Sequence, residues 1–266
     1  RNSGSMKNSG LEATISGKIL KTKDFEWDMT VMASTINNEV LKLTDDGKDI
    51  IEGSQIIREG EAIYSYYVCR SAGVDPMTGD QLYWATVDKK GNEMEPYITT
   101  DEGLAQSSRV VAGSKLPDLF GSISTQFRYK GFDLSIATNY SIGGEMVDGF
   151  YYPAQAKHKN LGRAWKKIGD VTDIPRYQIG KSYPTTDAML IDASYFAIKN
   201  ITLGYSLPDK TVKSLGLKGL RLALTADNLH VFTHLKGMDP QYSLIGGTSY
   251  VYTPTRTISF SLDVKF

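Results

Sequence analysis

The last stretch of the chain, from Thr253 to Phe266, alternates between apolar and polar side chains. From position 258 onward every even-numbered residue is large and apolar, in the order Ile258, Phe260, Leu262, Val264 and Phe266. Because successive side chains of a β-strand point to opposite faces, this pattern predicts a strand with one apolar and one polar face. A soluble β-sandwich also buries one face of each strand and would show the same pattern. The aromatic residue at the C-terminus favours a strand of a membrane β-barrel.

The charge balance and the residue types argue against several classes of protein. With 30 basic and 30 acidic residues the formal net charge is zero, whereas a nucleic-acid-binding protein usually carries a basic surplus. No segment approaches the ~18–20 apolar residues of a membrane-spanning helix. The single cysteine, Cys69, cannot form an internal disulfide and has no zinc-type Cys/His spacing around it. Ordinary packing is therefore the favoured role for Cys69.

Alternating runs elsewhere in the chain predict further strands. Two pairs of runs indicate hairpins, because short polar turns join 11–20 to 25–35 and 119–129 to 132–140. Three more strands are predicted at 195–207, 220–226 and 258–266. The remaining connections are long polar segments at 38–118, 144–192 and 230–253, and a shorter one at 208–219 with room for one helical turn. Within the first long segment we expect only short strands, at 64–68 and 82–87.

The connections alternate in length, and this favours a barrel. Compact soluble domains rarely contain loops beyond ~12–15 residues, whereas outer-membrane barrels have short periplasmic turns and long extracellular loops. Under that rule the C-terminus lies in the periplasm. Seven strands are fewer than the roughly eight of the smallest barrels, and lipid tolerates no open sheet edge. We therefore expect additional strands before Arg1. The start at Arg1, without methionine or a signal peptide, favours the same interpretation, that 1–266 is the C-terminal piece of a longer protein.

Aromatic side chains near the predicted strand ends fit the girdles that flank the lipid-facing band of a barrel. These side chains are Phe25, Trp27, Tyr129, Phe132, Tyr205 and Tyr252. Ordinary aromatic packing beside turns would explain each of them equally well.

A collinear series of short motifs resembles the TonB-dependent transporters, and more specifically their SusC/RagA-type branch. The Asn/Gly-rich lead NSGSMKNSGLE spans 2–12. The other motifs are AGVDPMTGDQLY at 72–83, YKGFDLS at 129–135, GDVTDIPR at 169–176, DASYFAIKNITLGYSLP at 192–208, ADNL at 226–229 and KGMDP at 236–240, followed by the closing strand to Phe266. Each motif alone is weak, but the ordered set covers essentially the whole chain.

The resemblance implies an all-β fold, an antiparallel transmembrane β-barrel of roughly 22 strands with a plugged lumen, of which 1–266 is the C-terminal part. It implies import of nutrient oligomers across the bacterial outer membrane, mostly oligosaccharides and in some members peptides. Expected partners are a SusD-like surface lipoprotein that acts as a lid and the TonB complex. The plug and the TonB-contacting segment would lie in the N-terminal region that this sequence lacks. The closing residues Phe260, Leu262, Val264 and Phe266 resemble the signal by which the barrel-assembly machinery recognises its clients.

Aromatic residues in the long polar segments are the candidates for stacking on a substrate. They are Tyr83, Trp84, Tyr151, Tyr152 and Trp165. Packing of the loops on one another, or on a lid, is the favoured explanation for each of them taken singly.

No pattern for catalysis, a metal or a cofactor emerges. His230 and His234 are spaced as on a metal-binding helix, but their neighbours place them at a strand end and in a loop. Asp75 and Asp80 bracket a turn that could hold calcium, yet turns use Asp and Gly in any case and the EF-hand pattern is missing. No nucleophile elbow, zinc-protease motif or P-loop occurs, and no paired carboxylates specify a glycosidase. We therefore expect a transporter and not an enzyme.

The competing hypothesis is a secreted all-β carbohydrate-binding or hydrolase domain of sandwich type. It would account for the alternation and for the aromatic loops. It would not account for the alternating loop lengths or for the terminal Phe266. Whether the apolar faces are covered by a second sheet distinguishes the two hypotheses.

Overall fold

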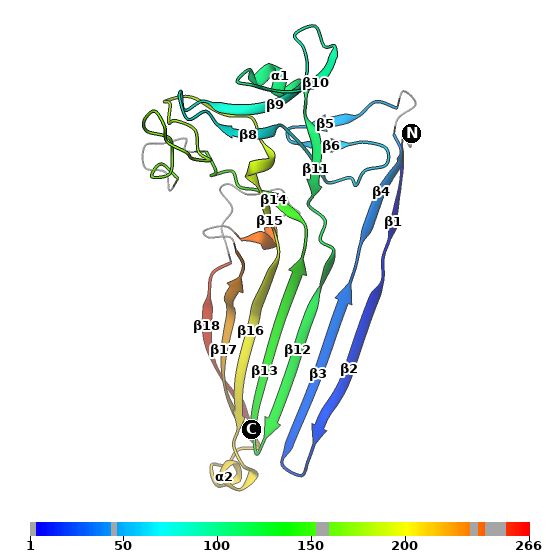
Figure 1. The fold of residues 1–266 in the computed structure, drawn as a ribbon. Helices are drawn as coiled ribbons and strands as arrows, with labels where there is room; N and C mark the ends of the chain where they lie inside the picture. Colours follow the sequence, from blue (N-terminus) through cyan, green and yellow to red (C-terminus); the bar gives the residue numbers. More distant parts are fainter. Residues whose placement is uncertain (1–3, 44–46, 153–159, 235–238, 243–253) are drawn as a thin grey trace.

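The computed structural model describes residues 4–43, 47–152, 160–234, 239–242 and 254–266. Its main element is one sheet of seven long antiparallel strands (Figure 1). These are β2 (Glu12–Lys21), β3 (Phe25–Ser34), β12 (Leu119–Tyr129), β13 (Phe132–Ile142), β16 (Tyr195–Ser206), β17 (Gly219–Phe232) and β18 (Thr257–Lys265). In space they follow one another in the order of the chain, so the sheet is an up-and-down meander. All the predicted long strands are confirmed.

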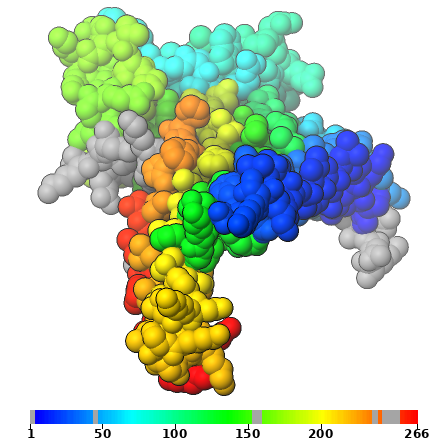
Figure 2. All heavy atoms as spheres, turned by 90° about the horizontal axis from the view of Figure 1, so that it is seen from below, coloured from blue at the N-terminus to red at the C-terminus, as the bar shows by residue number. Residues whose placement is uncertain are grey.

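The two predicted hairpins form with tight turns. Lys130 and Gly131, which join β12 to β13, both have positive φ angles, 44° and 89°. This is the backbone conformation that two-residue hairpin turns prefer. Seen from the end where these turns lie, the sheet follows a bent path from the blue N-terminal strands to the red C-terminal one (Figure 2).

One strand boundary was predicted wrongly. The alternation of β17 in the sequence ends at Ala226, which predicts a loop from position 230, but the strand continues to Phe232. Asn228 adopts a positive φ of 51°, and the register of β17 against β16 shifts between Ile198 and Asn200. This bulge adds a residue that breaks the alternation without ending the strand. The 195–207 run alternates less cleanly for a reason of its own, because the register of β16 against β13 shifts between Ala137 and Thr138.

The two faces of the sheet differ in chemistry, as two adjacent rows of paired residues show. One row of directly paired residues crosses all seven strands and is apolar throughout: Leu20, Trp27, Phe127, Leu134, Leu203, Leu224 and Phe260. The adjacent row on the opposite face is polar throughout: Lys18, Asp28, Gln126, Ser135, Thr202, Thr225 and Ser259. The register thus extends the one-strand pattern of the C-terminus across the whole sheet.

No second sheet covers the large side chains of the apolar face that the structure describes. Leu203 is 47% exposed, Leu224 50% and Phe260 69%, and Ile258 of the last strand is 67% exposed. Burying a side chain of this size is worth about 1.5–3 kcal/mol, so a water-soluble sandwich would not leave the row open. The described structure therefore argues against the sandwich hypothesis, whereas a face turned to hydrocarbon accounts for it.

The connections at one end of the sheet are short. Besides the two hairpin turns, β16 and β17 are joined by the predicted helical turn, α2 (Asp209–Ser214), and the C-terminus lies at this same end (Figure 1). Gly216 follows α2 with a φ of 73°, the left-handed conformation that commonly ends a helix. Within the described ranges, no helix is long and apolar enough to cross a membrane.

Aromatic rings gather near this end, as the girdle hypothesis predicts. The rings of Trp27 and Phe127 stack at 5.5 Å, and those of Phe132 and Tyr205 lie 4.4 Å apart. Phe25 packs 6.4 Å from Phe127. Tyr252, also predicted for a girdle, lies outside the described residues.

The long connections form a loop layer at the opposite end (Figure 1). Its elements are β1 (Ser5–Ser9), β4 (Asn37–Lys42), β5 (Ile50–Glu52), β6 (Gln55–Ile57), β7 (Ser65–Val68), β8 (Arg70–Val74), β9 (Gln81–Val87), β10 (Glu93–Thr99), α1 (Glu102–Ser107), β11 (Val110–Ser114), β14 (Glu145–Val147), η1 (Asp187–Met189), β15 (Leu190–Asp192) and η2 (Pro240–Tyr242). The pair β1–β4 follows on from the hairpin β2–β3, and the other strands of this layer form three small sheets, β11-β7-β6-β5, β10-β9-β8 and β14-β15. The expected short strands correspond to β7 and β9.

Candidate functional site

The polar face of the sheet carries two networks of ion pairs near the α2 end. Arg128 contacts Glu26 at 2.9 Å and Asp28 at 3.2 Å, and Lys18 contacts the same two carboxylates at 3.2 and 3.5 Å. A second network centres on Arg221, which lies 2.7 Å from Asp133 and 3.8 Å from Asp263.

These networks cross strand boundaries, and their geometry follows from the sheet register. Residues 26 and 128 are directly paired, as are 221 and 263. Opposite charges in paired positions stabilise a sheet. The sheet therefore has a hydrophilic face opposite its apolar face. Strands that separate lipid from an aqueous lumen have this arrangement.

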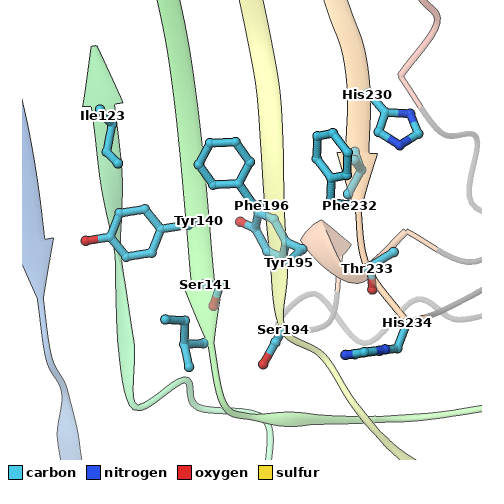
Figure 3. Close-up of a pocket in the computed structure, with 12 residues that line it drawn as sticks. Ile123, Tyr140, Ser141, Ser194, Tyr195, Phe196, His230, Phe232, Thr233 and His234 are labelled. Atoms are coloured by element: carbon cyan, nitrogen blue, oxygen red, sulfur yellow. The ribbon is translucent and has the colours of Figure 1, made fainter. Parts of the chain in front are cut away.

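A groove of about 830 Å³ lies at the loop end of the long strands (Figure 3). Its aromatic lining comes from three neighbouring strands, with Tyr140 on β13, Phe196 on β16 and Phe232 on β17. His230 packs edge-on against Phe232, with ring centroids 4.4 Å apart, and His234 lies at the same groove. Among the described residues, no group of three or more His, Cys, Asp or Glu side chains is placed to hold a metal.

The two carboxylates of the turn from Asp75 to Asp80 form hydrogen bonds and an ion pair within the protein. Asp75 accepts a hydrogen bond from the Met77 amide at 2.8 Å and another from the Thr78 hydroxyl at 2.9 Å. The Met77 amide bond is the main reason that the pKa of Asp75 is lowered. Asp80 forms an ion pair with Arg176 at 2.8 Å. This is the Asx-type turn that the sequence favours over a calcium site.

A tyrosine cluster occupies the loop layer. The rings of Tyr151 and Tyr152 are 5.0 Å apart, and Tyr183 lies 4.8 Å from Tyr152. The Tyr152 hydroxyl bonds to Gln81 Oε1 at 3.2 Å and lies 3.0 Å from Thr186 Oγ1. Burial, reinforced by the nearby Asp173 carboxylate, raises the pKa of Tyr151 to about 12. These phenols therefore remain neutral at physiological pH and act as stacking and hydrogen-bonding groups.

The structure separates the five aromatic residues that the sequence proposes for substrate contact. Tyr151 and Tyr152 come together, whereas Tyr83 is only 1% exposed and packs in a core with Cys69 and Ala105. Trp84 is the neighbour of Tyr83 on β9 and therefore points to the opposite face of that strand. Burial raises the pKa of the Cys69 thiol to about 11, as expected for a packing residue.

Trp165 packs on the Asp75–Asp80 turn. Its indole nitrogen donates a hydrogen bond to the Pro76 carbonyl at 3.0 Å, and a side chain at Gly79 would collide with its ring. Gly79 also has a φ of 76°, which favours glycine. The indole is therefore held in place by a turn whose Pro76 carbonyl lies 89 positions away in sequence.

Three residues of the cluster have no signal in the sequence. Gln81, Tyr183 and Thr186 become neighbours of Tyr152 only through folding, since Gln81 is 71 positions from it in sequence. Gln81 is nearly buried, and its amide nitrogen donates to the Ser71 hydroxyl and to the Gly73 carbonyl, both at 2.9 Å. This pairing fixes the orientation in which Gln81 faces Tyr152.

Comparison with known proteins finds similarity to TonB-dependent receptors. No protein-family model matches the sequence. Over its whole length the chain is 27% identical to TonB-dependent receptor P3 of Formosa agariphila and 28% identical to TonB-dependent receptor SusC of Bacteroides thetaiotaomicron, covering 29% and 27% of those proteins. The chain thus spans less than a third of the length of these curated relatives.

Solved structures agree in fold. The chain superposes over its full length on the structure of the RagAB peptide transporter with a TM-score of 0.83 and 26% identity, covering 30% of that chain. On the RagAB peptide importer in the open-open state the TM-score is 0.78, again at 26% identity, with 99% of this chain and 29% of that chain covered. Together with the two-faced meander, these similarities show that the chain resembles the C-terminal barrel portion of SusC/RagA-type TonB-dependent transporters.

Proposed function

We propose that this chain forms part of the wall of an importer that carries nutrient oligomers across the outer membrane with energy supplied through TonB. The observation that carries the proposal is the pair of adjacent rows, one apolar and one polar, that crosses every long strand. A wall of this kind separates lipid from an aqueous path. The activity is binding and gated passage, without a covalent step.

The rest of the barrel belongs to the same proposal. Strands β2 and β18 are the two edges of the sheet, and their unpaired backbone groups need partners in a membrane. We propose that strands N-terminal to this chain pair with both edges and that a plug, also N-terminal, fills the lumen and contacts TonB. The ion-pair networks around Arg128 and Arg221 would then face that plug.

For the cargo, we propose an oligosaccharide first and a peptide second. One similar protein is SusC, and the similar solved structures are those of a peptide transporter. The tyrosine cluster supports a sugar, because flat aromatic rings stack on apolar faces of sugar rings. Of the five aromatic residues, we propose that the half-buried Trp84, Tyr151, Tyr152 and Trp165 contact cargo directly, whereas Tyr83 supports them from the core.

An uptake assay tests the function. Cells that express the full-length transporter are given a panel of labelled oligosaccharides and peptides, and import is compared with cells lacking the transporter gene and with cells lacking TonB. We expect at least one oligomer to be imported only when both are present. Import that continues without TonB, or that is unchanged by deletion of the gene, contradicts the proposal.

We propose that the loop layer is extracellular and that α2 and the C-terminus are periplasmic, because outer-membrane barrels place long loops outside. Lys90 and Lys213 are exposed on the β9–β10 turn and on α2, so single cysteines can replace them without burying anything. We expect an impermeant maleimide to label Lys90→Cys in intact cells and Lys213→Cys only after the outer membrane is permeabilised. The native Cys69 is buried and serves as the unlabelled background. The reverse labelling pattern would invert the orientation.

We propose that a SusD-like lipoprotein covers exposed apolar side chains of the loop layer. Met77 is 60%, Ile168 67% and Val171 94% exposed. A hydrogen bond of 2.8 Å from the Gly169 amide to the Pro76 carbonyl holds the two segments together. Exposed apolar patches mark protein interfaces.

A charge within this patch tests the lid interface. We expect Val171→Asp to lower the amount of lipoprotein that co-purifies with the full-length transporter by roughly ten-fold, or ~1.4 kcal/mol, because the carboxylate would be desolvated. Leu215→Asp is the matched control, since Leu215 is 58% exposed on the segment that follows α2. Equal co-purification with both variants would show that this patch is not part of the interface.

A further inference from the structure

A small recess in the loop layer, distinct from the tyrosine cluster, holds an arginine without an acidic partner. The recess has a volume of about 200 Å³. Its lining is Gly53, Ser54, Tyr67, Cys69, Gln106, Arg109, Pro184 and Thr185. None of these residues is acidic, and three of them, Ser54, Tyr67 and Thr185, carry hydroxyl groups that can donate hydrogen bonds.

The guanidinium of Arg109 is fixed in position without being neutralised. Nε donates to the Gln106 carbonyl at 3.0 Å and Nη1 donates to the Gly53 carbonyl at 3.2 Å. Its central carbon lies over the Tyr67 ring, 4.7 Å from the centroid. Among the described residues, no carboxylate pairs with Arg109 and no acceptor is found for Nη2. The guanidinium group of Arg109 therefore lies at the recess with an unpaired positive charge and with N–H donors that can bind a ligand.

The other charged side chains near the recess have partners of their own. Arg58, whose guanidinium also lies over Tyr67 at 5.3 Å, is paired with Asp49 at 2.7 Å. Glu102 contacts Lys181 at 2.5 Å. Asp187 accepts a hydrogen bond of 2.8 Å from the Ser71 amide. Among the residues that line the recess, Arg109 is the cation that can bind a ligand.

The recess is joined to the tyrosine cluster through one short segment. Thr185 lines the recess and its carbonyl accepts from the Cys69 amide at 3.0 Å, while the next residue, Thr186, contacts the Tyr152 hydroxyl at 3.0 Å. A volume of about 200 Å³ is below the ~300–1,000 Å³ of sites that enclose a whole small molecule. The recess therefore suits one end group of a longer ligand.

We propose that this recess is a carboxylate-binding subsite, in which Arg109 binds an acidic end group of the imported oligomer. The inference rests on the proposed function and narrows its cargo to oligomers that carry a carboxylate. Two sources share this chemistry, a uronic acid unit of a glycan and the C-terminus of a peptide. Arg109 would bind either one through its free Nη2 group, with Ser54 and Thr185 as further donors.

Binding of matched ligand pairs to the full-length transporter in detergent tests the subsite, with calorimetry as the readout. In the glycan arm, trigalacturonate is compared with neutral galactotriose, and in the peptide arm a pentapeptide with a free C-terminus is compared with its amide. We expect the charged member to bind about ten-fold tighter in one arm, and the arm identifies the source. We expect this preference to shrink at high salt, because exposed charge interactions are screened.

Substitutions at Arg109 complete the test. We expect Arg109→Gln to abolish the preference while leaving the affinity for the neutral member and the thermal unfolding unchanged, and Arg109→Lys to retain part of it. Arg70→Gln, on an exposed arginine of β8 outside the recess, is the matched control and should behave as wild type. Equal affinity of charged and neutral members in both arms, or an equal loss in Arg70→Gln, overturns the subsite. TonB-dependent uptake would persist in that case, which separates this failure from a failure of the proposed function.

Discussion

Replacing Ile136 by arginine is expected to destabilise the assembled barrel by about 2–4 kcal/mol, whereas replacing its neighbour Ser135 is expected to cost little. Ile136 lies near the middle of β13 on the apolar face, in a row with Thr125, Ile201, Ala226 and Ile258. An arginine at this depth would face hydrocarbon, where its cost is largest. Ser135 lies on the polar face, where an arginine can stay hydrated.

Urea unfolding of the full-length transporter in lipid vesicles measures both changes. The two positions are adjacent, belong to the same strand and receive the same residue, so differences in strand propensity cancel. Outer-membrane abundance of the two variants provides the cellular counterpart. Equal destabilisation by Ile136→Arg and Ser135→Arg would mean that the two faces of the sheet do not differ in environment.

Deletion of Phe266 is expected to reduce the amount of assembled transporter several-fold. Phe266 ends the apolar series of the last strand and is 83% exposed, so in the described structure its ring packs little. We propose that Phe266, with Phe260, Leu262 and Val264, is read by the barrel-assembly machinery. A loss of assembly would therefore come from recognition and not from stability.

Heat-modifiable migration of outer-membrane extracts measures the folded fraction after deletion of Phe266. Lys265→Ala is the control, because Lys265 is the adjacent residue on the other face of β18. Unfolding of whatever transporter does assemble should be unchanged. Normal levels of folded transporter without Phe266 would contradict the role in assembly.

The long strands could be predicted because the alternation of apolar and polar side chains is visible within each strand alone. In β18 the alternation is strict, and a period of two has one structural explanation wherever a sheet has two different environments. The hairpin turn at Lys130–Gly131 adds a local signal of its own. The fold class and the strand order follow from these features and from the alternating lengths of the connections.

The boundary of β17 could not be predicted, because its cause is not local. The bulge at Asn228 lies where the register of β17 shifts against Ile198–Asn200 of β16, and the sequence of a single strand does not show how it pairs with its neighbour. The same holds for the strands of the loop layer, many of which are too short to show a period, such as the three-residue β5 and β6.

The candidate site was only partly accessible from sequence for a related reason. Residue type suggested Tyr151 and Tyr152, but it could not distinguish the buried Tyr83 from the half-buried Trp84 beside it. The partners of Tyr152 lie 71 and 34 positions away, and the carbonyl that holds Arg109 Nη1 is 56 positions away. Contacts at such separations have no pattern in a single sequence.

The most direct test of the two-faced wall is a spin-label scan of β18 in the full-length transporter in lipid vesicles. A nitroxide placed singly at positions 258 to 262 reports collisions with oxygen, which dissolves in lipid, and with a water-soluble nickel chelate. We predict that labels at Ile258, Phe260 and Leu262 favour oxygen, and that labels at Ser259 and Ser261 favour the chelate. Labels that favour the same collision partner at all five positions would contradict the assignment of one face to lipid and the other to an aqueous lumen.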